Sequence, residues 1–532
     1  MVSGHAGKAD YFCHGNFAAA ALVSKGRAHS GVSEAKATAA LDKHQAKISS
    51  FHCVEKSTQN QALSRKSGAA EKKGSSDTMP PVKDLTQGDP GQVLIRFTLP
   101  LFLSVFFQQL YNIADSAIAG TYIGEDALAA IGASYPITML FMAVAVGSQI
   151  GCSVVLGRLY GRKLFRRVRS CMTTALISGA ALSFLLTLFG IFASNQLMLL
   201  VHTPENILEN ATAYLKIYTS GFMFVHLYNI TTGLFSSLGD SKTPLYLLIF
   251  SSLGNILLDL LFILILQQGV AGLAWATLTA QAAACLLSLV LILRRLHHIP
   301  KDGASPPFSL RDFRDIVSVA VPSILQQSFI SVGNLIIQTF INPFGSSVIA
   351  GYSAAIKLNT FALTCFTNMS SGISSFTAQN LGAALPKRVR KGFSAALKMA
   401  CGTALIFAML YLLCGNELLR LFMNRNSTKL ALETGRRFML LTAPAYPIIC
   451  IKIIADGVLR GSGAMRYFMT ATLVDLVLRV LLAWIFSRFF RETGIWMAWP
   501  ISWAIATILS IVFYRKGVWQ THIEISSVNH TS

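Results

Sequence analysis

Two carboxylic acids, Asp115 and Asp259, lie within long apolar stretches of this 532-residue sequence. An ionisable side chain in mid-membrane costs about 2.5–3.5 kcal/mol on insertion scales, so it calls for a function or a partner. Asn255 and Asp259 are four residues apart, and a helix places them on one face. A carboxylate among leucines and isoleucines resists ionisation and can take up a proton. Asp115, Asn255 and Asp259 therefore predict a site for proton or cation exchange. The simpler alternative for Asn255 and Asp259 is that they hold helices together by hydrogen bonds.

Polar side chains precede Asp115 at helical spacing. Gln108, Tyr111, Asn112 and Asp115 follow the pattern i, i+3, i+4, i+7 and share one helix face. Such a face is expected to point into a cavity rather than toward lipid, which makes Gln108, Tyr111 and Asn112 candidate substrate-cavity residues. The alternative is that Asp115 lies near the outer end of its helix and is solvated there.

The second half of the chain carries a different set of charges. Lys452 and Asp456 are four residues apart, and so are Asp475 and Arg479. Pairs of opposite charge at this spacing are most simply internal salt bridges. Lys357 has no partner nearby in sequence, so it either lines the central cavity or pairs with Asp456 or Asp475 across helices.

The composition indicates the elements that hold these residues. The chain is 53% hydrophobic and only 13% charged, against about 25% charged in soluble domains. Apolar stretches recur from about residue 93 onward, each long enough to cross a ~30 Å hydrocarbon core. Lipid offers no partner for free backbone groups, so these stretches should be helices. A net charge of +21 would suggest nucleic acid for a soluble chain. Here the basic residues fall in short loops, which indicates membrane orientation instead, and we expect no nucleic-acid binding.

The apolar stretches predict twelve membrane spans. Loops on one side carry most of the basic residues, including the runs from Arg162 to Arg169 and from Lys387 to Lys391, whereas the other side carries fewer, such as Arg436 and Arg437. The positive-inside rule then places both termini in the cytoplasm and the chain in the inner membrane. The predicted spans cover residues 93–120, 127–156, 168–193, 211–237, 244–266, 270–293, 314–341, 347–379, 393–415, 436–459, 466–487 and 494–514.

An internal repeat relates the two halves. Pro100 and Asn112 recur as Pro322 and Asn334 at one constant offset, and Ala274-Trp275 recurs as Ala498-Trp499 at nearly the same offset. Six spans per copy is an even number, so both copies insert in the same orientation, as in transporters whose halves are related by an axis along the membrane normal. Channels and membrane enzymes built by duplication are the alternatives.

The repeat divides the chain into segments. Residues 1–79 form an N-terminal extension of Ala, Ser, Gly, Lys and His, expected to be disordered, and translation beginning at Met79 is an alternative to that extension. We predict an N-lobe over residues 80–295, a cytoplasmic linker over 296–313, a C-lobe over 314–515 and a cytoplasmic tail over 516–532.

Four motifs carry a family resemblance. The segment from Gln108 to Gly120 resembles the first-helix signature of the multidrug and toxic compound extrusion (MATE) family, and the segment from Asn255 to Phe262 resembles its fifth-helix motif. Phe235–Asp240 and Gly457–Gly461 are similar to the ends of its fourth and tenth helices. The likeness is greatest to the prokaryotic DinF-like branch.

The resemblance implies an all-α membrane fold of twelve helices in two six-helix lobes around a V-shaped central cavity. It also implies that Asp115, Asn255 and Asp259 couple transport to a cation. It places Gln108, Tyr111 and Asn112 near the substrate. Lys357 and the Asp475/Arg479 pair resemble polar positions of the C-lobe, and we add Gln327 and Asn334 as cavity candidates. NorM-like members carry acids in the seventh and tenth helices, whereas here the seventh span offers only Gln326 and Gln327, which favours coupling in the N-lobe.

The sequence therefore predicts a secondary multidrug antiporter that acts as a monomer in the lipid bilayer. It would export cationic amphipathic molecules in exchange for H⁺ or Na⁺, with no cofactor and no bound metal. One alternative is a lipid-linked saccharide flippase, which would need a strongly basic cavity and often two further spans. The other is a membrane-embedded enzyme, but the chain contains no P-loop, no His-Glu-x-x-His and no candidate triad.

Overall fold

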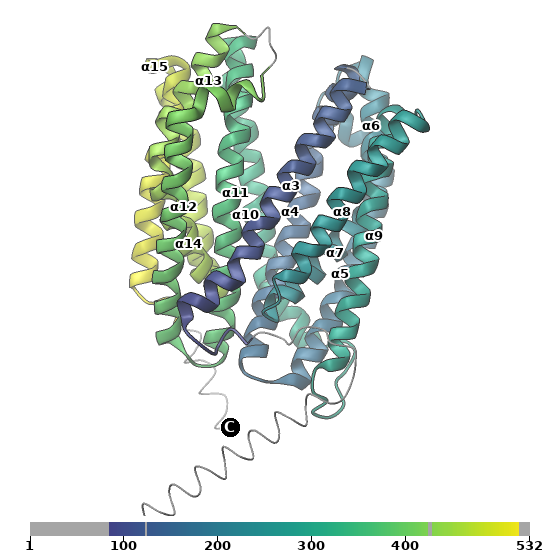
Figure 1. Ribbon diagram of the computed structural model, residues 1–532, viewed down its shortest axis with the longest axis vertical. Helices are drawn as coiled ribbons and strands as arrows, with labels where there is room; N and C mark the ends of the chain where they lie inside the picture. Colours follow the sequence, from purple (N-terminus) through teal and green to yellow (C-terminus); the bar gives the residue numbers. More distant parts are fainter. Residues whose placement is uncertain (1–83, 123–124, 424–427, 521–532) are drawn as a thin grey trace, which may run out of the picture. The chain divides into compact units, whose positions relative to one another are not determined.

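The computed structural model describes residues 84–122, 125–423 and 428–520, which lie in a compact unit that begins at Val82. The predicted N-terminal extension and most of the predicted C-terminal tail lie outside these residues. The described part is helical throughout (Figure 1).

We refer to α3–α9 as the N-terminal group and to α10–α15 as the C-terminal group. The elements are α3 (Pro90–Tyr122), α4 (Glu125–Gly161), α5 (Phe165–Leu200), α6 (Glu205–Ser220), α7 (Phe222–Ser237), α8 (Lys242–Leu260), η2 (Leu261–Ile265), α9 (Gly269–His298), α10 (Leu310–Ile341), η3 (Asn342–Phe344), α11 (Ser346–Gly382), α12 (Pro386–Arg420), α13 (Lys429–Thr442), η4 (Ala443–Ala445), α14 (Tyr446–Gly461) and α15 (Met465–Arg515).

Ten helices of the described chain are long and apolar enough to cross a membrane, and two local irregularities account for the difference from twelve predicted spans. The predicted span 211–237 is divided at Gly221 into α6 and α7, each of 16 residues and too short alone. Conversely, α15 joins two predicted spans across Arg491, whose backbone is not helical (φ 54°, ψ −140°). With α6 and α7 taken as one span and α15 as two, the described helices match the twelve predicted spans.

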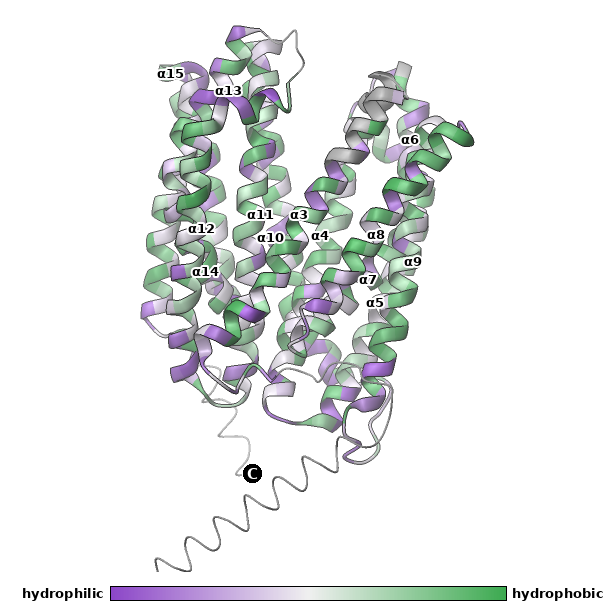
Figure 2. Ribbon diagram, viewed as in Figure 1, coloured by the Kyte–Doolittle hydropathy of each residue, from purple (hydrophilic) through white to green (hydrophobic). Residues whose placement is uncertain are grey.

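The outer surfaces of these helices are apolar. Large hydrophobic side chains stand exposed along their length, for example Phe192, Leu257, Ile406 and Leu413. Figure 2 shows that apolar residues predominate along the helices and that polar residues are more frequent toward the helix ends. A soluble protein rarely leaves so much apolar surface uncovered, so this surface is the one that faces lipid.

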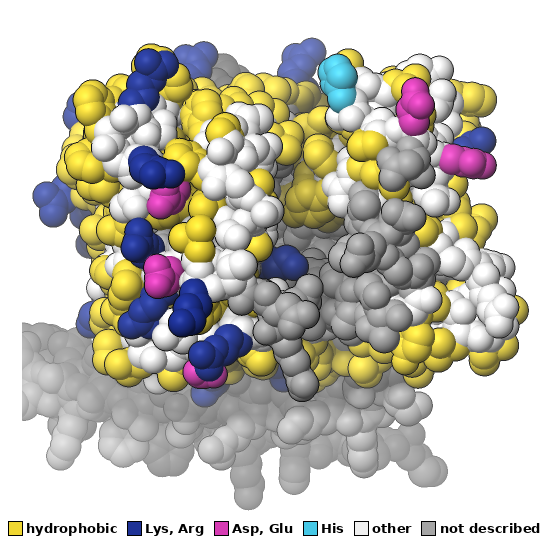
Figure 3. Space-filling model, turned by 90° about the horizontal axis from the view of Figure 1, so that it is seen from above, with side chains coloured by type: hydrophobic (Ala, Val, Ile, Leu, Met, Phe, Trp, Pro, Cys, Tyr) yellow, Lys and Arg dark blue, Asp and Glu magenta, His cyan; other side chains and the backbone are white. Residues whose placement is uncertain are grey.

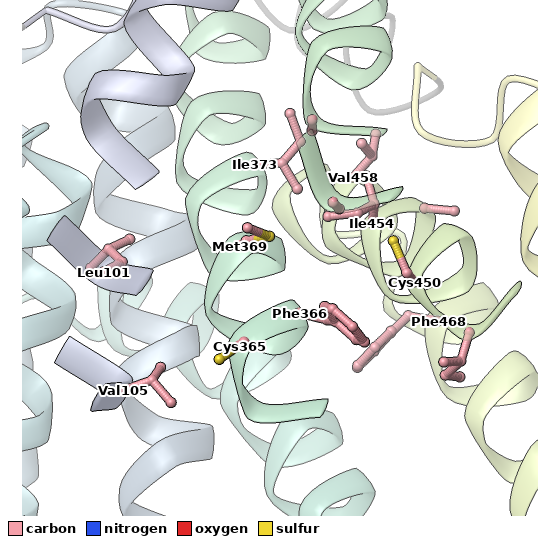
Figure 4. Close-up of a cluster of buried hydrophobic side chains, with 14 of the residues drawn as sticks. Leu101, Val105, Cys365, Phe366, Met369, Ile373, Cys450, Ile454, Val458 and Phe468 are labelled. Carbon is pink, nitrogen blue, oxygen red and sulfur yellow. The ribbon is translucent and has the colours of Figure 1, made fainter. Parts of the chain in front are cut away.

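Because lipid is as apolar as leucine, the helices must be held by close packing and polar contacts. In the C-terminal group, α11 packs on α14 and also on α3 of the N-terminal group. Figure 4 shows both contacts, with the α3 side chains on one side of α11 and those of α14 on the other. The labelled buried residues are Leu101, Val105, Cys365, Phe366, Met369, Ile373, Cys450, Ile454, Val458 and Phe468.

The two groups meet through contacts that repeat across the duplication. A Cβ atom added to Gly161, at the end of α4, would overlap the backbone oxygen of Gln379 on α11. A Cβ atom added to Gly382, at the end of α11, would overlap the backbone oxygen of Arg158 on α4. Gly382 is the counterpart of Gly161 in the repeat, and Gln379 is the counterpart of Arg158, because both pairs have the same offset in the sequence. Each half therefore presents the same glycine and the same backbone to the other.

A second set of contacts has the same symmetry farther along these helices. A Cβ on Gly151 of α4 would lie 2.7 Å from the Cβ of Ala320 on α10, and a Cβ on Gly372 of α11 would overlap the side chain of Thr98 on α3. Gly151 and Gly372 are counterparts in the repeat, and so are Thr98 and Ala320. The predicted repeat is thus also a repeat of contacts.

Hydrogen bonds connect the two groups at the end of the interface where Gly161 and Gly382 lie. Gln379 is fully buried, accepts from the Leu85 N–H (3.0 Å) and donates to the Ser237 carbonyl (2.6 Å). Asn380 donates to the Leu85 carbonyl at 3.2 Å. The C-terminal group thereby binds both the segment before α3 and the end of α7. In Figure 1 the two groups approach each other at this end and diverge toward the other.

The opposite end is seen in Figure 3, where Lys and Arg side chains gather over the C-terminal group. The end of α12 contains Arg420, α13 contains Arg436 and Arg437, and the bend in α15 lies close to Arg488 and Arg491.

Candidate functional site

The predicted acid on α8 is deeply buried. Asp259 has no exposed surface and Asn255, one turn earlier, is 3% exposed. With its amide oriented to satisfy both neighbours, Asn255 donates to Asp259 Oδ2 (2.9 Å) and accepts from the backbone N–H of Thr277 on α9 (3.2 Å). Asp259 Oδ1 has no hydrogen-bond partner. The π-helical turn η2 begins two residues later, and such turns occur frequently at functional sites.

The second predicted acid lies close enough to act with the first. Asp115 on α3 is half-buried, its Oδ1 has no hydrogen-bond partner, and its carboxyl group interacts electrostatically with that of Asp259. Tyr111 lies near Thr277 and both acids. The structure therefore brings together four of the predicted residues, Tyr111, Asp115, Asn255 and Asp259. We call them, with Thr277, the carboxylate site.

Two tyrosines of α6 extend this site. Tyr214 lies near Tyr111 and both acids, and its ring stacks on that of Tyr218 at a centroid distance of 6.4 Å. Tyr214, Tyr218 and Thr277 were not predicted. The spacing i, i+4 of the tyrosines was a signal that they share a face, but nothing in the sequence showed which helix they would meet.

The other predicted cavity residues are exposed or half-buried. Gln108 and Asn112 of α3 and Asn334 of α10 are exposed, and Gln327 of α10 is half-buried. Asn112 donates to Gln109 at 3.2 Å. Their predicted contact with substrate stays a prediction.

Lys357 on α11 is exposed, and its ammonium lies 5.9 Å from the ring centre of Phe422. The acids considered as its partners, Asp456 and Asp475, form ion pairs with nearer neighbours.

Both predicted pairs in the C-terminal group form. Lys452 Nζ lies 2.7 Å from Asp456 Oδ2, and Arg479 Nη2 lies 2.8 Å from Asp475 Oδ2. The Ser510 hydroxyl donates to the remaining Asp456 oxygen at 2.7 Å. All of these side chains are buried, so each charge depends on its partner for compensation.

Replacing Ser510 by alanine is expected to lower the free energy of unfolding by about 1.5–3 kcal/mol, because it removes a hydrogen bond to a buried charge. Unfolding in mixed detergent micelles measures the change. Ser487→Ala on the same helix is the control, since that hydroxyl bonds only the carbonyl of its own helix at Trp484. Equal stability of the two variants would contradict the prediction.

A chamber lies between the two groups, next to the closed end of their interface. It is partly open to solvent and, with that open part counted, contains about 800 Å³ of empty space. The hydroxyls of Ser153 on α4 and Ser375 on α11 meet there at 3.3 Å, and Ser375 is next to Ser374, the counterpart of Ser153 in the repeat. The sequence did not predict the lining of this chamber, which is Leu101, Ser104, Gln149, Ile150, Ser153, Val154, Tyr228, Asn229, Thr232, Ser236, Pro244, Leu248, Asn368, Ser371, Ser374, Ser375 and Arg460.

Comparison with known proteins identifies the family. The MatE family model matches twice, over residues 100–261 and 322–485, which together make up more than half of the chain. The two matches begin at Pro100 and Pro322, which are the prolines that the repeat pairs.

Relatives support the same assignment. The chain is 27% identical over 438 residues to the probable multidrug resistance protein YpnP of Bacillus subtilis, covering 82% of this chain and 97% of that protein. It is 25% identical over 312 residues to a protein named FAD transporter of Shewanella oneidensis, covering 58% of this chain and 69% of that one.

A solved structure shows the same fold. It is described as the outward-facing conformation of a multidrug resistance MATE family transporter of the MOP superfamily, and it matches with a TM-score of 0.78 at 22% identity. The match covers 84% of this chain and 100% of that one. This likeness confirms the predicted all-helical membrane fold. The chain is a multi-pass membrane protein and belongs to the MATE family of multidrug efflux transporters.

Proposed function

We propose that this chain exports amphipathic organic cations in exchange for H⁺ or Na⁺, and that Asp115 and Asp259 bind the exchanged ion. The observation that carries the proposal is the proximity of these two acids, each with one oxygen that has no hydrogen-bond partner. Two neighbouring carboxylates, one fully buried and one half-buried, repel each other when both are charged, and a bound cation relieves that repulsion. A proton, a sodium ion or a cationic substrate can each do so. Competition between ion and substrate for the same charge is the basis of antiport.

Alternating access would turn this competition into transport. With both termini in the cytoplasm and the chain in the inner membrane, the contacts at Gly161 and Gly382 close the cytoplasmic side. The N-lobe and C-lobe then rock about the midplane, as in other transporters built from repeats. Coupling arises because ion and substrate differ in affinity for the two states. The stacked tyrosines Tyr214 and Tyr218 supply aromatic surface that favours an organic cation. The DinF-like motifs are consistent with coupling through N-lobe acids.

Asp115→Asn is expected to abolish drug-driven ion exchange in proteoliposomes while leaving folding intact. Asparagine keeps the shape of a protonated carboxyl group but cannot change charge. The assay follows rhodamine 123 transport under a pH gradient alone and a sodium gradient alone, and the gradient that drives transport identifies the ion. Asp302→Asn, at an exposed acid between α9 and α10, is the matched control. Coupled transport at the wild-type rate in Asp115→Asn would remove Asp115 from the mechanism.

A further inference from the structure

The chamber between the two helix groups is lined by a positively charged side chain that has no role in the ion exchange proposed for the carboxylate site. Most of its polar lining consists of hydroxyl and amide side chains, such as Gln149, Asn229 and Asn368. Among the described residues that line it, Arg460 of α14 is the one charged side chain, and none is a carboxylate. The chamber therefore combines apolar and neutral polar side chains with a single positive charge.

The Arg460 guanidinium has capacity to bind a further group. The residue is 6% exposed, its Nη2 donates to the Ser370 hydroxyl (3.3 Å), and its Nε has no hydrogen-bond partner. The ring of Phe468 lies 5.8 Å from its central carbon. A guanidinium carries five N–H donors and no acceptor, so one neutral hydroxyl satisfies only a small part of it.

The protein itself compensates little of this charge. The acid that acts on Arg460 electrostatically is Asp456, one turn earlier on α14. Both Asp456 oxygens are already engaged, one by Lys452 (2.7 Å) and one by Ser510 (2.7 Å). The three charges of α14 therefore leave one net positive charge beside the chamber. A buried cation without a full counter-charge is costly, and an anionic ligand would relieve that cost.

The other half of the repeat shows that the fold does not need an arginine here. The turns after α7 and α14 have one hydrogen-bond pattern. Gly239 N–H bonds to the Ser236 carbonyl (3.1 Å), and Gly463 N–H bonds to the Arg460 carbonyl (2.9 Å). Both glycines have positive φ, at 78° and 71°. Aligning the two turns on these glycines pairs Arg460 with Ser236, and both line the chamber. A serine is thus sufficient for the turn.

We infer that Arg460 forms an anion subsite in the chamber, which takes a carboxylate or phosphate group of the transported molecule. The planar fork of a guanidinium matches such groups with two parallel hydrogen bonds. The serines and amides of the lining can bind the remaining oxygens. The inference rests on the proposed function, and it widens the substrate class from organic cations to zwitterionic amphiphiles, whose cationic part the carboxylate site attracts.

Equilibrium binding to the purified full-length protein tests the subsite. Rhodamine 110 carries a free carboxylate, and rhodamine 123 is its methyl ester, so the two dyes differ only at the group that Arg460 would bind. Fluorescence anisotropy without any ion gradient should show rhodamine 110 bound about tenfold or more tightly, the effect of one charge-assisted bond in a desolvated site.

Three variants locate the effect. Arg460→Ser, which installs the residue of the other half, should remove the difference between the dyes, whereas Arg460→Lys should keep part of it. Arg466→Ser, at an exposed arginine of α15, should behave as wild type. Equal binding of the dyes by wild type, or a difference that survives Arg460→Ser, would overturn the subsite. Since binding is measured without a gradient, loss of ion-driven rhodamine 123 export would count against the proposed function alone.

Discussion

Replacing Asp259 by asparagine is expected to reduce ion-coupled export of rhodamine 123 to the level of empty liposomes. Asp259 is fully buried, accepts one hydrogen bond from Asn255 and retains one oxygen without a partner. The amide fits the same space but has no charge to exchange, so Asp115 remains as a single acid. A single acid has no neighbouring charge to repel, and the requirement for a compensating cation is lost.

The measurement compares initial rates in proteoliposomes at matched protein content, with folding checked by elution as a single detergent-solubilised species. Glu433→Gln is the control, because Glu433 is an exposed acid of α13 that forms only a surface pair with Arg437 (3.8 Å). Export by Asp259→Asn at more than half of the wild-type rate would show that this acid has no part in coupling.

Alanine at Gly161 is expected to shift the protein strongly toward conformations in which the closed end of the interface is open. The added Cβ would overlap a backbone oxygen of α11, which cannot rotate away as a side chain can. Overpacking of this kind costs about 1–3 kcal/mol, which changes a two-state equilibrium by roughly 5-fold to more than 100-fold. Gly382→Ala should have a similar effect, because it makes the symmetry-related contact.

Spin labels attached to Lys163→Cys and Ala384→Cys lie beside the ends of α4 and α11. Double electron–electron resonance spectroscopy then measures the distance between the two labels. For Gly161→Ala, the expected result is a larger fraction of molecules in which the two labels are far apart. Gly402→Ala on α12 is the matched control, since a Cβ there meets no atom within 4 Å. An unchanged distance distribution would mean that the contact does not hold the two groups together.

The sequence predicted the large-scale arrangement well because that arrangement follows from local rules. Apolar length located the spans, and Pro100 and Pro322 located the two copies of the repeat. The exceptions were local too. Gly221 divides one span into α6 and α7, and Arg491 adopts a positive φ while α15 continues around it.

The carboxylate site was predicted only in part. Spacing within one helix placed Asn255 beside Asp259, because both lie on one face. Thr277 and Tyr214 come from other helices, and their contribution depends on how α6 and α9 rotate against α3 and α8. The spacing of residues within a single helix does not show how that helix is rotated against its neighbours.

The sequence also did not show which residues line the chamber. Arg460 was noted only as part of a motif at the end of its helix, and nothing in its spacing showed that it borders a space between the two groups. The sequence drew attention instead to Lys357, whose lack of a local partner made it conspicuous. The structure places Lys357 over Phe422, and its predicted role in the cavity stays a prediction.

The matched glycine contacts bear on the ancestry of the chain. Gly161 contacts Gln379, and Gln379 is the counterpart of Arg158, which lies one turn before Gly161 on its own helix. Ser153 likewise contacts Ser375, the residue next to its counterpart Ser374. A protein half this length could use one surface for both partners and assemble as a two-fold symmetric homodimer in which each such contact is made twice. Fusion of two genes would then have required no new interface, and afterwards each copy was free to diverge, as the pairing of Arg460 with Ser236 illustrates.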